Sequence, residues 1–75
     1  MTVEQAVWQD NDRMSGVLCF RNTRIPVSTL FDHLEAGKLQ DFYVDFPDVN
    51  PEMVNAVLEG ARELLETKFR GSSAA

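Results

Sequence analysis

Apolar residues recur at helical spacing over the last third of the chain. From residue 50 onward they fall three and four positions apart, which places them on one face of a helix. These residues are Val54, Val57, Leu58, Ala61, Leu64 and Leu65. Asn50 is a favourable N-cap and Pro51 fits the first helical position, where no N–H partner is needed. Because Gly71 follows two cations that suit a helix C-terminus, the pattern predicts a helix that ends near Phe69.

Two shorter helices are predicted before it. Ser28 can cap the first, which carries apolar residues on one side and stops at Gly37; these are Leu30, Phe31 and Leu34. The second presents a bulky aromatic face and must end at Pro47. That face consists of Leu39, Phe42, Tyr43 and Phe46.

Short apolar runs upstream predict a β-hairpin. The runs are Val17–Phe20 and Ile25–Val27, with Asn22 between them as a residue that tolerates the positive φ of a tight turn. Pro26 cannot donate to a ladder, so we expect the second run to be an edge strand, which invites pairing with another chain. Residues 1–8 are expected to add a strand or a short helix through Val3, Ala6, Val7 and Trp8.

The predicted fold is mostly α, with an N-terminal β-hairpin followed by three helices. The short link between the second and third helices fixes them at an angle, as in a helix-turn-helix core of homeodomain-like or winged-helix-like type or in another small trihelical core. We expect an N-terminal arm over 1–14, a single domain over 15–69 and a flexible tail over 70–75.

The length and the net charge of the chain disfavour some classes of function. The chain has 75 residues, with 12 acidic and 7 basic side chains, for a formal net charge of −5. A core of this size is marginal alone, so we expect a homodimer or a complex. Excess acid disfavours tight nonspecific binding to nucleic acid. With no apolar stretch suited to a signal peptide or a membrane helix, the sequence predicts a cytoplasmic protein that does not contact membranes.

No catalytic or metal-binding set is recognisable, which predicts a protein that is not an enzyme and holds no cofactor, metal or small-molecule substrate. Cys19 lies in an apolar run and is interpreted as a buried structural residue, and His33 as a surface residue. The carboxylates of Asp41, Asp45 and Asp48 lack the spacing of a calcium loop and indicate a solvated acidic face.

The outward face of the last predicted helix is the candidate DNA-binding surface. Its residues are Asn50, Glu52, Asn55, Glu59 and Arg62. Asn55 has the chemistry to read adenine and Arg62 to read guanine. The alternative is an ordinary solvated face with an Arg62–Glu66 pair at i, i+4, and the glutamates in the set favour it.

Arg21 and Arg24 form the most concentrated positive charge of the chain and flank the predicted hairpin. One interpretation is that they bind phosphates or the carboxylates of a partner. The other, slightly favoured, is that they pair with acidic residues of the helices and hold the hairpin in place; the candidates are Asp32, Asp41 and Asp45.

Five segments together resemble a bacterial family called domain of unknown function 433. They are Asp12–Gly16 (DRMSG), Thr23–Val27 (TRIPV), Leu30–Gly37 (LFDHLEAG), Phe42–Pro47 (FYVDFP) and the apolar helix Val54–Leu65. The resemblance implies a small helix-turn-helix fold and a role as the antitoxin partner of a PIN-like ribonuclease toxin. It also implies that the antitoxin covers the toxin's acidic metal site, for which Arg21, Arg24, Lys68 or Arg70 are natural ligands.

The sequence departs from the family pattern at three places. Asn22 replaces a turn glycine, and Leu18 replaces a proline and thereby restores a backbone donor. The stretch Gly37–Leu39 is one residue shorter than usual and lacks the Ser or Thr that caps the second helix. We therefore expect that helix to start late or to depend on a partner for support.

The sequence is compatible with three functions. The first is an antitoxin-like protein that neutralises a PIN-like toxin by direct contact and binds operator DNA as the complex; its evidence is the aromatic face and the basic hairpin. The second is a stand-alone helix-turn-helix regulator that reads DNA through Asn55 and Arg62. The third is a structural dimer that pairs through the edge strand Ile25–Val27.

Overall fold

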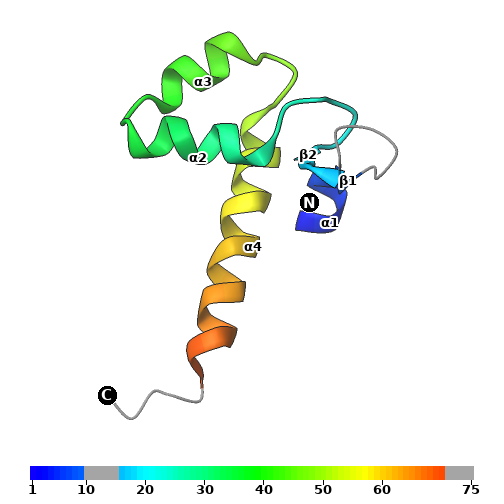
Figure 1. Ribbon diagram of the computed structural model, residues 1–75, viewed down its shortest axis with the longest axis vertical. Helices are drawn as coiled ribbons and strands as arrows, with labels where there is room; N and C mark the ends of the chain where they lie inside the picture. Colours follow the sequence, from blue (N-terminus) through cyan, green and yellow to red (C-terminus); the bar gives the residue numbers. More distant parts are fainter. Residues whose placement is uncertain (10–15, 71–75) are drawn as a thin grey trace.

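The computed structural model describes residues 1–9 and 16–70. A two-stranded antiparallel sheet and three principal helices follow one another along the chain, as predicted (Figure 1). The elements are α1 (Val3–Ala6), β1 (Val7–Gln9), β2 (Leu18–Phe20), α2 (Val27–Glu35), α3 (Leu39–Asp45) and α4 (Pro51–Phe69). None of the helices in these residues combines the length and the hydropathy that a bilayer crossing requires.

The predicted run around Leu18–Phe20 forms a strand, β2, but its partner strand is not the predicted one. β2 pairs with β1, in the register Val7 to Phe20 and Gln9 to Leu18. The segment that begins at Ile25 contributes only an isolated bridge through Pro26 to the other side of β2. The reason is that Pro26 has no N–H to donate, and its fixed φ of −63° places it at the N-cap of α2. The prediction of an edge strand there was wrong.

The N-terminal residues are built into the domain and do not stand apart as an arm. Thr2 and Gln5 form a reciprocal capping box that starts α1. Ala6 is fully buried, and Trp8 donates its indole N–H to the Thr23 carbonyl at 2.9 Å. The contact of α1 with α4 is close, because a Cβ built on Gly60 would lie 2.9 Å from the Val3 Cβ. Residues 10–14 of the expected arm lie outside the described residues.

The turn after β2 confirms the prediction for Asn22, which has a φ of 63°. Asparagine is the residue after glycine that tolerates this region best. The turn is closed by the Thr23 N–H, which donates to the Phe20 carbonyl at 3.0 Å. The Thr23 hydroxyl donates to the same carbonyl and accepts from the Ile25 N–H. This turn carries the chain from β2 directly into α2.

α2 begins two residues earlier than predicted, at Val27 with Pro26 at the N-cap position and no side-chain cap, so Ser28 does not cap it. Its end at Gly37 is confirmed, since Gly37 has a φ of 70°. The Gly37 N–H donates to the Leu34 carbonyl and the Lys38 N–H to the His33 carbonyl, which is the Schellman arrangement. α3 follows at Leu39, also uncapped. It does not start late, because packing of its aromatic face replaces the missing cap.

The core lies where α2, α3, the sheet and the first half of α4 meet. Its fully buried large side chains are Phe20, Leu30, Phe42, Val49 and Val54. Phe42 lies at the centre, with ring centroids 6.0 Å from Phe20 and 5.2 Å from Phe46. Phe42 is fully buried, and the other residues of the aromatic face are half-buried and pack against the core, so most of this face belongs to the core.

α4 has the predicted start and end. The Met53 N–H donates to the Asn50 side-chain oxygen at 2.9 Å, and Pro51 occupies the first turn. The first half of the helix is packed against the body, whereas the second half projects away from it (Figure 1). We call residues 61–69 the stalk. Residue 70 closes the helix, and residues 71–75 of the expected tail lie outside the described residues.

Candidate functional site

The five candidate DNA-binding residues share the outward face of α4 and its cap, and all are exposed. Four of the five have polar partners within the chain. Asn50 caps the helix, Glu52 lies 3.9 Å from the N-terminal ammonium group, and Arg62 lies 3.6 Å from both Glu59 and Glu66. The Arg62–Glu66 pair of the simpler interpretation is thus present. The charged groups of the face are two carboxylates, which phosphates repel, and one guanidinium that lies between two carboxylates.

The candidate partner-binding residues are divided between two ends of the molecule. Arg21, Arg24 and Ile25 lie in or just after the turn that leads into α2, whereas Lys68 and Arg70 lie at the far end of α4 (Figure 1). The structure therefore does not bring the five residues together into one site.

Arg21 has a structural contact, as favoured from the sequence, but with a different partner. Its guanidinium donates to the backbone carbonyl of Glu4 at 2.6 Å and so ties α1 to the turn after β2. Arg24 is exposed and makes no ion pair with any described residue. Ile25 is half-buried and packs against the core. No pairing of Arg21 or Arg24 with Asp32, Asp41 or Asp45 is found among the described residues.

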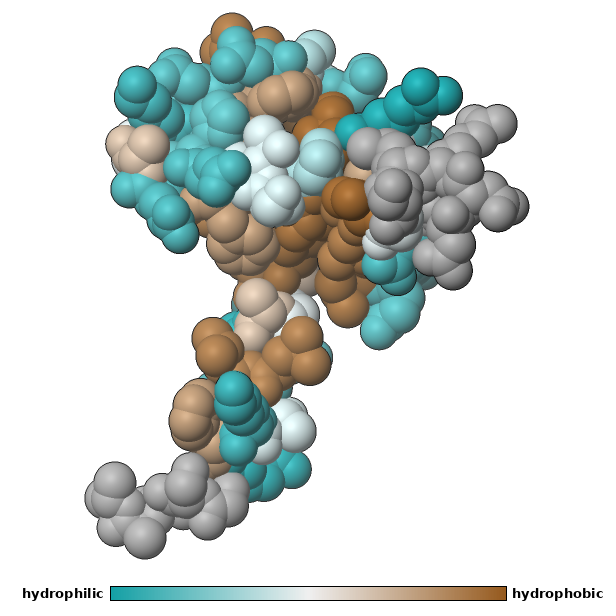
Figure 2. Space-filling model, in the orientation of Figure 1, coloured by the Kyte–Doolittle hydropathy of each residue, from teal (hydrophilic) through white to brown (hydrophobic). Residues whose placement is uncertain are grey.

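The stalk has an exposed apolar surface that is not among the DNA-binding or partner-binding residues predicted from the sequence. We call it the distal stripe and define it as Ala61, Leu64, Leu65 and Phe69. Leu64 is 75% exposed, Leu65 60% and Phe69 57%, although all continue the helix face that buries Val54 and Val57. Figure 2 shows hydrophobic surface on the part of the molecule that projects from the body. The periodicity of the sequence did find Leu64 and Leu65, but it indicated only that this face is apolar.

The tip of the stalk adds positive charge to the distal stripe. By helical spacing Lys68 lies on the same face as Ala61 and Leu64, and its ammonium group lies 5.7 Å from the centre of the Phe69 ring. Arg70 follows one residue beyond the helix proper. Neither cation forms an ion pair with a described residue. The tip is therefore both apolar and cationic on a chain that is acidic as a whole.

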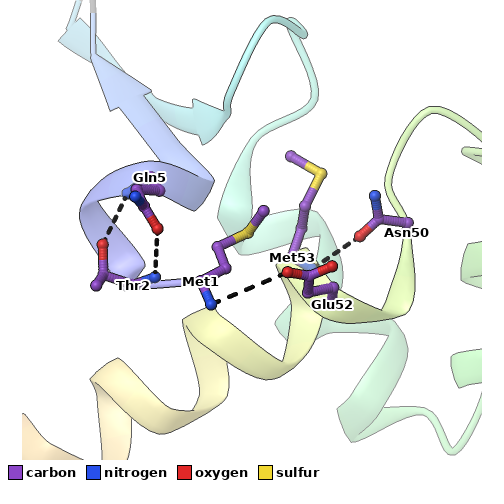
Figure 3. A network of polar contacts seen from close by, with 6 residues as sticks. All are labelled: Met1, Thr2, Gln5, Asn50, Glu52 and Met53. Atoms are coloured by element: carbon purple, nitrogen blue, oxygen red, sulfur yellow. Dashed lines mark hydrogen bonds and ion pairs between the residues drawn. The ribbon is translucent and has the colours of Figure 1, made fainter.

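A second feature is an open hollow beside α1, with a volume of about 620 Å³. It lies between α1, the turn after β2 and the connection from α3 to α4. Met1 and Met53 contribute flexible apolar surface to it, and Arg21 and Asp48 contribute charge. Figure 3 shows Met1 lying across the first turn of α4, with its ammonium group toward Glu52. We call this feature the methionine hollow.

Cys19 and His33 have the surroundings of structural residues. Cys19 is 2% exposed, and burial raises the pKa of its thiol, which disfavours the reactive thiolate. His33 is half-buried and not the surface residue expected. Its Nδ1 donates to the Thr29 carbonyl at 2.8 Å, and its ring stands edge-on to Phe42. Within residues 1–9 and 16–70, no three His, Cys, Asp or Glu side chains gather in a way that could hold a metal ion.

Comparison with known proteins gives a family but no characterised relative. No curated protein and no solved structure matches the chain. A family model described as a protein of unknown function, DUF433, matches residues 7–59, which run from β1 into the middle of α4. The match ends just before the stalk. Since it covers more than half of the sequence and spans the hairpin, α2, α3 and the first half of α4, the chain belongs to the DUF433 family.

Proposed function

We propose that this protein is a cytoplasmic, antitoxin-like binding protein that neutralises a PIN-like ribonuclease toxin by direct contact through the distal stripe. The observation that carries the proposal is the exposure of Leu64 and Leu65 on a helix that projects from the body. Exposed leucine side chains keep apolar surface in contact with water, and burying them against another surface is favourable by the hydrophobic effect.

The shape of the stalk favours a groove as its binding site. An amphipathic helix that enters an apolar groove uses anchors spaced three and four residues apart. Ala61, Leu64 or Leu65, and Lys68 or Phe69 have this spacing. The anchors lie on a helix whose first half is held by the core, so little conformational entropy is lost when the stalk binds.

Charge selects the kind of partner. Lys68 lies on the same helix face as the distal stripe and beside Phe69, so the surface that covers the stripe must place acceptors near its ammonium group. A nuclease site that holds metal ions is built from carboxylates, and Lys68 and Arg70 are suited to bind them. This tip, and not the turn with Arg21, is the cationic end that we expect to approach the toxin.

A stand-alone DNA-binding regulator has less support. Its candidate face carries Glu52 and Glu59, and Arg62 lies between two glutamates. A base contact by Arg62 would leave those carboxylates facing phosphates. We expect operator binding, through a helix-turn-helix core, only from the complex with a basic partner. The structural dimer through Ile25–Val27 loses its basis, because that segment does not form a strand.

Co-expression with the product of the adjacent gene tests the proposal. The wild-type chain should co-purify with a PIN-like neighbour and relieve the growth arrest that the neighbour causes. Replacing Leu64 and Leu65 with Ser should weaken the complex at least tenfold, because both anchors are lost. The matched control is Val44→Ser, which removes an apolar side chain that is 77% exposed on α3. Equal binding by all three chains would contradict the role of the stripe, and a harmless neighbour that does not bind would contradict the antitoxin function.

A further inference from the structure

The distal stripe and the methionine hollow have complementary properties. The stripe ends in Leu65 and Phe69, which are bulky and project from a helix. The hollow is concave and is partly lined by Met1, which is 53% exposed and whose unbranched side chain adapts to the shape of a neighbour, with the mostly buried Met53 beneath it. Both belong to α4 or pack on it, with the hollow at its N-terminal end and the stripe at its C-terminal end.

The charges at the two ends of α4 are also complementary. The stalk tip carries Lys68 and Arg70 without ion-pair partners among the described residues. The other end carries Asp48 at the hollow and Glu52 in the first helical turn, where the side chain is 68% exposed. Arg21 also lines the hollow, and the Met1 ammonium group lies 3.9 Å from Glu52, so Asp48 and Glu52 are the groups that a cation from a second chain would approach. A copy laid antiparallel brings the cations of one chain to the carboxylates of the other.

Contact area favours a reciprocal arrangement. The stalk of residues 61–69 is about 13 Å long, and its four stripe residues cover only a fraction of the ~800 Å² that each partner contributes to a stable interface. In a two-fold dimer each copy supplies both a stalk and a hollow, so every contact occurs twice. An antiparallel arrangement also places the two wide bodies at opposite ends, whereas a parallel one would crowd them together (Figure 1).

We propose that a second copy of this chain covers the distal stripe when no other partner is bound. In this dimer the two α4 helices run antiparallel, and each stalk tip lies in the methionine hollow of the other copy. Self-association then regulates the stripe, because a toxin must displace the second copy to reach Leu64 and Leu65. The competition, but not the self-association, rests on the proposed function.

Sedimentation equilibrium of the full chain alone, over a hundredfold range of concentration, tests the dimer. The wild-type chain should pass from the mass of one chain to the mass of two. The tip variant Lys68→Glu/Arg70→Glu and the hollow variant Asp48→Lys/Glu52→Lys should each dissociate at least tenfold more readily, with unchanged helical circular dichroism. An equimolar mixture of the two variants should recover the dimer, since every contact again joins opposite charges.

Control variants separate the proposed contacts from general charge effects. Asp41→Lys/Asp45→Lys changes the charge by as much as the hollow variant, and Lys38→Glu by half as much as the tip variant. These residues lie on or beside α3, outside the stalk and the lining of the hollow, so both controls should leave the dimer unchanged. A wild-type chain that stays monomeric, or a dimer that the tip and hollow variants leave intact, would overturn the proposal. So would equal weakening by the control variants. A dimer that forms as expected while no toxin binds would contradict only the proposed function, and toxin binding by a strictly monomeric chain would contradict only the dimer.

Discussion

The two halves of α4 have the same apolar periodicity and opposite surroundings. In the first half Val54 is 1% exposed and Val57 is 5% exposed, because α1, α2 and the sheet pack around them. In the second half Leu64 and Leu65 continue the same face and remain largely exposed. A single helix thus closes the core at one end and presents an uncovered apolar surface at the other.

This difference separates two kinds of information in a hydrophobic pattern. The spacing of apolar residues establishes that one face of a helix avoids water. It does not establish whether the chain itself or another molecule covers that face. In the first half of α4 the rest of the chain covers the apolar face. The apolar face of the stalk also needs a cover, and we propose a toxin or a second copy of the chain for that role.

The largest expected effect on the free energy of unfolding comes from comparing a phenylalanine of the core with one of the stalk. Phe42→Ala should lower the free energy of unfolding by about 3–5 kcal/mol, since it removes a fully buried ring at the centre of the core. Phe69→Ala should change it by less than about 0.5 kcal/mol, because that ring is 57% exposed. Urea unfolding followed by circular dichroism measures both. If Phe42→Ala does not fold, Phe42→Leu provides a smaller loss to compare.

The next effect concerns the point where the covered half of α4 ends. Gly60→Ala should destabilise the protein by about 1–3 kcal/mol, because the new methyl group would meet Val3 at 2.9 Å. Adding Val3→Ala to Gly60→Ala should recover part of the loss by making room for that methyl group. A Gly60→Ala chain more stable than wild type would show that helix propensity outweighs the close packing of α1.

Loss of the cap at the covered end should have a moderate effect. Asn50→Ala should lower stability by about 1 kcal/mol, because the Met53 N–H loses its acceptor. Asn50→Asp keeps an acceptor and serves as the control. Hydrogen exchange at the first turn of α4 should increase in the alanine variant only. Equal exchange in both variants would mean that packing, and not the cap, fixes this end.

The smallest effect belongs to the outward face of α4. Arg62→Ala should cost no more than about 0.5–1 kcal/mol, since its two ion pairs are exposed and screened by solvent. The loss should diminish in 0.5 M salt, as measured by thermal unfolding. A loss above 2 kcal/mol that salt does not reduce would indicate that Arg62 has a packing role in addition to the ion pairs.

Local rules encoded much of the fold. Asn50 and Pro51 determined where α4 begins, Gly37 determined where α2 ends, and Asn22 supplied a turn with positive φ. Each of these follows from backbone geometry or hydrogen bonding within a few residues, so it can be read without knowledge of distant contacts. The family could also be identified from short motifs, for the same reason.

Features that depend on distant partners could not be obtained in this way. The sequence offered two candidates to pair with β2, and tertiary structure chose Val7–Gln9 because α1 docks on Gly60 and aligns a strand with a full set of donors. It also buried the aromatic face of α3 and left the end of α4 uncovered. Both faces carry apolar residues at helical spacing, and the limited size of the body decides which of them it can enclose.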